Sequence, residues 1–353
     1  MGPLIVVFLR GGADGLSLAP PTGDADYASV RSGLAVADGA ANPLDGTFAM
    51  HPALGELHAR FVRGEVALVP ACGIPELSRS HFDAQFRVEE AGKSSGSGDG
   101  TGWLGRHLAS SAGDTNPFRG VSFGQAGVPR LLAGSADVVT ATTLTGLSIG
   151  NGRLDPFPQF TDTLEEMWAT SASPIKAAAV SGFGALRTAS SISAGGSDGR
   201  DHGVADTVAT LNAGVGAEVA VVNIGGWDTH DNQGTNDGAF ASLAADLDGS
   251  IDALMAGVPG ATVVVITEFG RRVAPNSSGG CDHGRGSLVV VAGPEVNGGV
   301  KGDWPGLSDL DEGDVRTVND IRVVMAEVTG AVLGTDPAQV VPESPGGSLD
   351  LFT

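Results

Sequence analysis

The chain is poor in cysteine and in basic residues. Its 353 residues include only two cysteines, Cys72 and Cys281, which excludes a disulfide scaffold as the basis of the fold. The 20 lysines and arginines are outnumbered by 41 aspartates and glutamates, giving a formal net charge of −21. Because a nucleic-acid partner requires a basic face to meet its phosphates, this balance argues against nucleic acid as a partner.

Long hydrophobic runs are also missing. No stretch of roughly 18 apolar residues occurs, so we expect no membrane-spanning segment. The first apolar run, residues 4–9, is short for a secretory signal and has neither a basic flank nor a small-residue cleavage site. For the chain as written we therefore expect a cytoplasmic location.

Short, continuous apolar runs predict the fold. They cover residues 4–9, 218–224, 261–267 and 287–292. β-branched runs of this length are typical of strands buried on both faces of a parallel sheet. Together with a hydrophobic content of 41%, they predict one α/β domain over residues 1–353 with a mostly parallel sheet and an inserted helical and loop region around residues 93–200.

Carboxylates and imidazoles lie next to the ends of these runs. They are Asp14, Asp228, His230, Glu268, Asp282 and His283. Ligands in open α/β sheets collect at the carboxyl ends of strands, so we expect these side chains to converge. Such a set of oxygen and nitrogen ligands favours zinc, manganese, magnesium or calcium, and each motif alone is equally compatible with an exposed turn. Two ions about 3.5–4 Å apart would activate a nucleophile and stabilise a leaving oxygen.

Ser80 opens a predicted helix and allows two interpretations. With Asp83 three residues later, it resembles a helix capping box. The same position faces the unpaired N–H groups of the first helical turn and the positive end of the helix dipole, which suits a nucleophile that attacks an anionic ester. The local pattern leaves both interpretations open.

Four arginines lie beside these motifs: Arg10, Arg79, Arg271 and Arg285. A guanidinium group can hold a phosphoryl or sulfuryl group through two parallel hydrogen bonds. The alternative for each arginine is that it neutralises a neighbouring carboxylate.

Five motifs taken together resemble a known family. They are FLRGGADGL at residues 8–16, RSHF at 79–82, GWDTH at 226–230, TEFGR at 267–271 and DHGRG at 282–286. They look like the motifs of the bacterial domain-of-unknown-function family numbered fifteen hundred and one. The resemblance implies a three-layer α/β/α sandwich similar to that of alkaline phosphatases and sulfatases. Many members carry a twin-arginine signal, which implies an exported protein if such a signal precedes the chain as written.

The resemblance also implies roles for individual residues. Asp14 matches the acidic metal ligand after the first strand, and His283 matches the late histidine ligand. Asp228 and His230 resemble the Asp and His of one metal site. Phe269 stands where the wider superfamily has a histidine, so the second metal site lacks a ligand unless another residue, His81 or Asp282, supplies it.

Ser80 is the best match to the nucleophile of the superfamily, with Ser78 as the alternative. Its neighbours Arg79 and His81 complete the expected catalytic set. The function implied is a metal-dependent hydrolase of phosphate or sulfate esters, acting on an anionic ester of a small molecule or a glycan. The alternative is a non-catalytic protein on the same fold that binds metal or carbohydrate, or that acts in assembly.

Overall fold

The computed structural model describes residues 2–37, 39–76, 78–92, 100–110, 115–147, 158–197 and 201–353. Within these residues nine strands form one sheet, in the order β10-β4-β9-β8-β1-β7-β5-β6, with β13 also paired to β4. These strands are β1 (Leu4–Leu9), β4 (Val66–Gly73), β5 (Gly120–Phe123), β6 (Val139–Ala141), β7 (Val219–Ile224), β8 (Thr262–Thr267), β9 (Ser287–Ala292), β10 (Gly299–Val300) and β13 (Asn319–Asp320).

The sheet is mostly parallel, as the apolar runs predicted. β1 lies in its centre and pairs in parallel with both β7 and β8. β9 runs antiparallel to its two neighbours, β8 and β4. The start of β9 therefore lies at the edge of the sheet where β1, β7 and β8 end.

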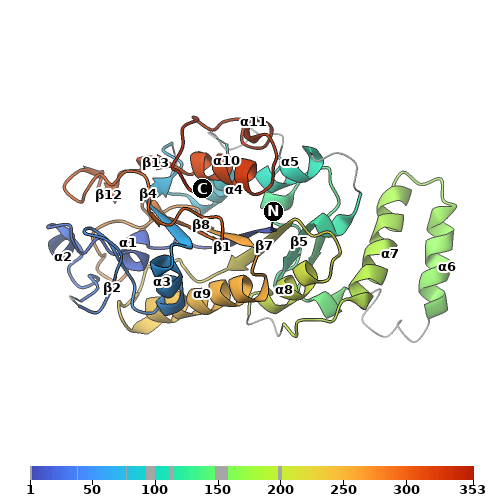
Figure 1. The fold of residues 1–353 in the computed structure, drawn as a ribbon, viewed down its shortest axis with the longest axis horizontal. Helices are drawn as coiled ribbons and strands as arrows, with labels where there is room; N and C mark the ends of the chain where they lie inside the picture. The colour runs from blue at the N-terminus through green and yellow to red at the C-terminus, as the bar shows by residue number, and fades with distance from the viewer. Residues whose placement is uncertain are drawn as a thin grey trace.

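Helices cover both faces of the sheet (Figure 1). On one face lie α4 (His81–Glu90), α5 (Trp103–Ser110), α10 (Ile321–Ala331) and α11 (Pro337–Val340). On the other lie α3 (Gly55–Val62), α8 (Val204–Asn212) and α9 (Gly238–Gly257). The strands supply both cores because successive side chains point to opposite faces. In β1, for example, Ile5, Val7 and Leu9 join the α3/α8/α9 core, and the alternate residues join the other.

Smaller elements complete the fold. Short helices are α1 (Gly15–Leu18) and α2 (Tyr27–Val30), with 3₁₀ turns η1 (Pro117–Arg119), η2 (Arg130–Leu132) and η3 (Leu144–Gly146). Two hairpins stand outside the main sheet, β2 (Asn42–Pro43) with β3 (Ala49–Met50), and β11 (Leu310–Asp311) with β12 (Asp314–Val315). In the described residues no helix combines the length and apolar character needed to cross a membrane.

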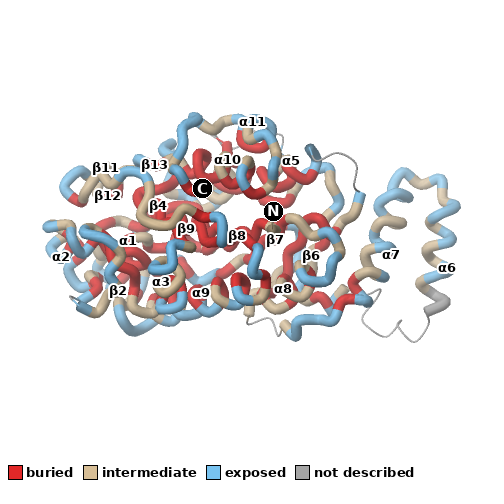
Figure 2. Tube along the Cα trace, viewed as in Figure 1, coloured by how far each residue is buried: buried red, intermediate tan, exposed pale blue. Residues whose placement is uncertain are grey.

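Part of the region around residues 93–200 belongs to the main sheet. Its strands β5 and β6 extend the main sheet beyond β7. The helical hairpin of α6 (Pro158–Ala169) and α7 (Lys176–Ser191) stands beside the body of the molecule in Figure 1. Figure 2 shows most of that hairpin as exposed or intermediate, in contrast to the buried strands.

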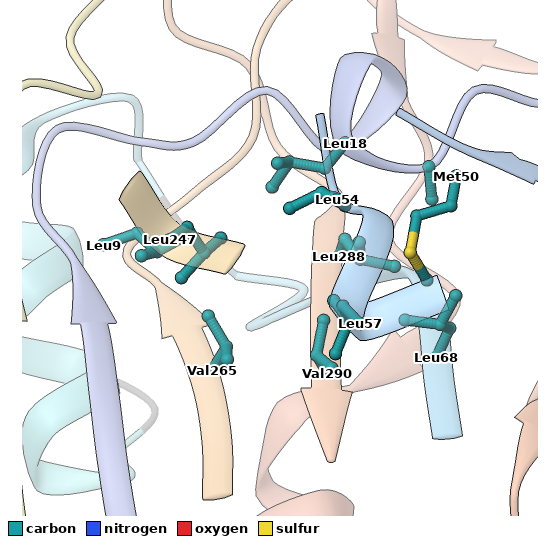
Figure 3. Close-up of a pocket in the computed structure, with 11 residues that line it drawn as sticks. Leu9, Leu18, Met50, Leu54, Leu57, Leu68, Leu247, Val265, Leu288 and Val290 are labelled. Atoms are coloured by element: carbon teal, nitrogen blue, oxygen red, sulfur yellow. The ribbon is translucent and has the colours of Figure 1, made fainter. Parts of the chain in front are cut away.

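A small apolar cavity lies within the core between the sheet and α3 (Figure 3). Eleven apolar residues line it: Leu9, Leu18, Ala19, Met50, Leu54, Leu57, Leu68, Leu247, Val265, Leu288 and Val290. Since no polar side chain faces this space, it offers no partner to a water molecule or a polar ligand. The cavity is a packing feature beneath the strand ends and is separate from the polar motifs.

Candidate metal centre

Asp228 is the centre of a group of three imidazoles. It lies in the loop after β7, and its Oδ1 atom is 3.1 Å from Nε2 of His230 and 3.1 Å from Nε2 of His283. Its Oδ2 atom is 3.4 Å from Nε2 of His81. Ligand atoms of His81, Asp228 and His283 all lie within 4.8 Å of one another, which is close enough for one ion to contact all three.

The topology of the sheet explains this convergence. β7 ends just before Asp228, and the antiparallel β9 begins just after His283 at the same edge. His81 is the first residue of α4, which starts there too. The close approach of the loops requires glycine at position 11, where φ is +124° and an added Cβ would lie 2.4 Å from the backbone nitrogen of Asp228.

Each of the three imidazoles is oriented through its Nδ1 atom. Nδ1 of His81 lies 2.9 Å from a carboxylate oxygen of Glu268, and Nδ1 of His230 lies 3.1 Å from Asp282 Oδ1. Nδ1 of His283 lies 2.8 Å from the backbone carbonyl of Arg79. All three partners are acceptors, so each Nδ1 atom is placed to donate a hydrogen bond to its partner. The Nε2 atom of each ring faces Asp228.

Such a set of acceptors fits a metal ion. Nε2 of His230 and Nε2 of His283 lie 2.9 Å apart, and Nε2 of His81 is buried without a hydrogen-bond partner. Lone pairs and a carboxylate at these distances repel one another unless a proton or a cation lies among them. Histidine ligands of metal ions characteristically donate the other ring N–H to a carboxylate or a backbone carbonyl, as these three do. The two nitrogens of His81 and His283 and the carboxylate oxygen of Asp228 are a ligand set that zinc accepts, and His230 lies next to them.

Asp228 is held in its ionised form. Partial burial alone would raise its pKa, but the hydrogen bond from Arg271, with contributions from His283 and His230, lowers the pKa to about 2. Asp282 also has a lowered pKa, chiefly because Asn276 and His230 hydrogen-bond to it. Both carboxylates therefore carry a negative charge at neutral pH.

Glu268 supports the group from behind. It is completely buried, and its Oε1 atom accepts hydrogen bonds from His81, from Gln85 Nε2 and from the Gly11 backbone N–H, each at 2.9 Å. His81 and Gln85 reach it together because residues four apart share one face of a helix. The structure thus places Glu268 as the residue that orients His81. The spacing of Gln85 from His81 is the sequence signal that could have identified it.

Asp14 lies apart from the three imidazoles. Its Oδ2 atom forms a buried ion pair with Arg31 and accepts hydrogen bonds from Ser17 and Gln233, each at 2.7 Å. Burial alone would raise the pKa of Asp14, but the Arg31 guanidinium and the hydrogen bonds lower it. Asp14 therefore has a buried structural partner, Arg31, that lies outside the sequence motifs.

Arg271 is an internal clamp in the structure. Its fully buried guanidinium donates to the backbone carbonyls of Gly12 at 2.6 Å, Trp227 at 2.9 Å and Cys281 at 3.0 Å, and to Asp228 at 2.6 Å. It joins the loops after β1, β7 and β8 and holds the carboxylate of the candidate site.

The other predicted arginines also have protein partners. Arg10 donates to Glu89 at 2.7 Å and to Asn223 at 2.6 Å. Arg79 and Arg285 bind the acidic residues of the β11–β12 hairpin. The alternative in which these arginines neutralise carboxylates therefore describes their contacts in this structure.

Ser80 occupies the N-cap position of α4 without acting as a cap. Its side chain makes no capping hydrogen bond and the residue is exposed. Ser78 is the serine that contacts Asp83, at 2.7 Å. Ser80 lies between two residues of the site, because the Arg79 carbonyl holds His283 and His81 faces Asp228.

Phe269 fills space beside the imidazoles. Its ring centroid is 4.9 Å from that of His81 and 4.7 Å from that of His283, and it is buried. A second ligand group at this position is absent, and the aromatic ring instead packs the two histidines in place.

Comparisons with known proteins match part of the chain to a family and name no activity. Residues 196–351 match the family described as Protein of unknown function (DUF1501). The match contains Asp228, His230 and His283, whereas His81 lies before it. No curated protein matches the chain. The match covers residues 196–351 and supports the assignment of that segment to the DUF1501 family.

Proposed function

We propose that this protein is a metal-dependent hydrolase of phosphate or sulfate esters, with one divalent metal ion bound by His81, Asp228 and His283 and with His230 beside it. One observation carries the proposal: three imidazoles, each fixed through Nδ1, direct their Nε2 atoms at one ionised carboxylate. The finer assignment of the fold to an alkaline-phosphatase-like sandwich belongs to the same proposal, and helices on both faces of a mostly parallel sheet support it.

The nitrogen-rich ligand set favours some of the four metals expected from the sequence, which are zinc, manganese, magnesium and calcium. Imidazole suits zinc and other transition metals, whereas magnesium and calcium prefer oxygen ligands. We therefore expect zinc to bind most tightly, followed by manganese. A bound divalent cation would supply Lewis-acid stabilisation of charge on an ester oxygen.

The protein's own residues supply the rest of the proposed chemistry. Ser80 is an exposed hydroxyl at the start of a ten-residue helix, between Arg79 and His81. The helix dipole and the unpaired N–H groups of its first turn favour an anionic group at that position. We assign Ser80 the role of nucleophile toward the phosphorus or sulfur atom, with the alcohol of the ester as leaving group.

A non-catalytic binding or assembly protein is the second candidate. Phe269 packing against two of the imidazoles favours it, because the superfamily has a histidine ligand at that position. Such a protein would bind metal without turning over an ester. The hydrolase and a metal-binding protein would therefore differ in ester turnover, and both would bind the metal ion.

Metal analysis and an ester screen together test the proposal. The purified protein, stripped with a chelator and then titrated with zinc, manganese, magnesium or calcium, should bind one zinc ion per chain. Chromogenic phosphate and sulfate esters should then be hydrolysed by the zinc or manganese form. One bound zinc ion without turnover of any ester supports a metal-binding protein, and failure to bind a transition metal refutes the hydrolase and leaves a carbohydrate-binding or assembly protein as the candidate.

A further inference from the structure

The tip of the β11–β12 hairpin carries a glutamate in an unfavourable backbone conformation. Its two central residues are Glu312, with φ +54°, and Gly313, with φ +90°. A two-residue hairpin with positive φ at both positions favours Asn, Asp or Gly at the first, because their side chains tolerate the left-handed region. Glutamate does not favour the left-handed region in this way, so the contacts of the Glu312 side chain are of interest.

The Glu312 carboxylate bridges two arginines beside the candidate metal centre. Its Oε2 atom lies 3.4 Å from Nη2 of Arg79 and 3.3 Å from Nη2 of Arg285. The glutamate side chain is 66% exposed, against 31% and 26% for the two arginines. Long, exposed ion pairs of this kind contribute little stability and exchange readily with solvent ions.

Both arginines are anchored independently of Glu312. Arg79 donates from Nε to the fully buried Asp314 at 2.8 Å, and Arg285 donates to Asp311 at 2.8 Å. Nε of Arg285 is buried without a hydrogen-bond partner and lies 3.8 Å from Asp314 Oδ2. Removing the Glu312 carboxylate therefore leaves both guanidinium groups oriented by Asp311 and Asp314, with their exposed Nη2 side freed of the Glu312 anion.

The two arginines flank the candidate site along the chain. Arg79 precedes Ser80, and its carbonyl accepts the hydrogen bond from His283 Nδ1 at 2.8 Å. Arg285 follows His283 by two residues. An oxyanion held between their Nη2 atoms would therefore lie beside the proposed nucleophile and ligands.

We propose that Arg79 and Arg285 form a subsite for an oxyanion and that the Glu312 carboxylate occupies it until a ligand displaces it. The chemical class of the ligand is a phosphate or sulfate group, whose oxygens can accept from both guanidinium groups at once. As a statement about substrate, this inference rests on the proposed function; as a statement about anion binding, it does not.

Binding of inorganic sulfate and phosphate tests the subsite directly. Calorimetric titrations are done on the full chain with zinc and again after chelation, so that binding to the metal can be separated from binding to the arginines. Glu312→Gln should bind sulfate more tightly than the parent, by roughly threefold to tenfold, because a competing carboxylate is removed. The gain should persist after chelation, diminish with added sodium chloride and vanish in Glu312→Gln/Arg285→Gln.

Asp309→Asn is the matched control. Asp309 is an exposed carboxylate that pairs with Arg316, at 2.8 Å, and should leave sulfate affinity at the parental value when substituted. Equal affinities of Glu312→Gln and the parent, with Glu312→Gln folded by circular dichroism, overturn the subsite even if esters are hydrolysed. Tighter sulfate binding by Glu312→Gln without ester turnover upholds the subsite and counts against the hydrolase.

Discussion

The Nε2 atoms of His230 and His283 lie 2.9 Å apart, while the Nδ1 atom of each ring donates to a separate acceptor. Two neutral rings in this arrangement have no proton left to place between them. A metal ion held by both Nε2 atoms would stabilise this geometry, with the two Nδ1 atoms still bonded to their acceptors.

Replacing His81 should remove metal affinity. His81→Ala deletes one nitrogen ligand, so we expect most of the bound zinc to be lost. The rise in melting temperature that zinc gives the parent should be lost too, because only the native state holds the assembled site. His58→Ala is the control, since His58 contacts only the Pro43 carbonyl among the hydrogen bonds described. Full zinc content in His81→Ala would exclude this residue as a ligand.

Replacing Glu268 should weaken the site without abolishing it. Glu268→Gln keeps the shape of the side chain and removes the charge that orients His81. Loss of such an outer-shell carboxylate typically lowers metal affinity by about 10–100-fold. Zinc affinities from competition with a chromophoric chelator provide the measurement. A loss as complete as that of His81→Ala would instead identify Glu268 as a direct ligand.

Replacing Asp14 should affect stability and leave metal content unchanged. Asp14→Asn leaves the buried Arg31 guanidinium without its carboxylate, at a cost of about 3–5 kcal/mol in the free energy of unfolding. The double variant Asp14→Asn/Arg31→Met should recover part of that loss, because it also removes the unpaired charge. Urea unfolding measures both effects. Zinc loss from a double variant that folds normally would instead show that Asp14 serves the metal.

The same ion pair should shape the acid side of the stability curve. Arg31 and the hydrogen bonds to Asp14 hold its pKa below the ordinary value of 3.8. The ionised carboxylate therefore stabilises the fold fully above that value, and this contribution is lost as the pH falls through the lower pKa of the folded state. Melting temperatures should be measured from about pH 6 to about pH 2.5, a range that includes the ordinary titration of an aspartate. Over this range they should fall less steeply for Asp14→Asn/Arg31→Met than for the parent. Parallel curves would contradict the assignment.

Replacing Ser80 should affect turnover alone. Since Ser80 forms no capping hydrogen bond, Ser80→Ala should cost less than the roughly 0.5–2 kcal/mol typical of a lost N-cap. As the proposed nucleophile, it should lower kcat by several orders of magnitude while zinc stays bound. Ser80→Asn should be equally inactive. An active Ser80→Asn enzyme would exclude Ser80 and direct attention to Ser78.

The sequence predicted the positions of the strands around the site, but not the side-chain contacts that the site residues make. Residues 4–9, 218–224, 261–267 and 287–292 were expected as strands from their continuous apolar character, and the structure has strands there. Apolar character alone carries no strand direction, so the antiparallel course of β9 could not be predicted. Even so, the loop before β9 reaches the expected edge of the sheet.

Contacts between distant side chains were beyond the sequence patterns. Asp14 and Glu268 both adjoin strand ends, as metal ligands often do, but Arg31 pairs with one and His81 with the other. Which carboxylate faces a ligand and which faces a buried donor depends on packing across the loops. His81 likewise lies with the imidazoles because α4 begins at the strand ends, a placement that its motif could not determine.

The central position of β1 has a consequence for how the chain can be divided. β1 lies between β7 and β8, so the segment that matches the family, residues 196–351, has a gap in the middle of its sheet when it stands alone. A polypeptide limited to that segment would also lack β4, β5 and β6, so β7 would have no partner strand and β8 and β9 would each have one unpaired edge, and the polypeptide should aggregate. Two separately expressed pieces, residues 1–195 and 196–353, should instead refold only when mixed, with β1, β4, β5 and β6 restoring the missing strands of the sheet. The limits of family similarity in this protein are therefore not the limits of a unit that folds by itself.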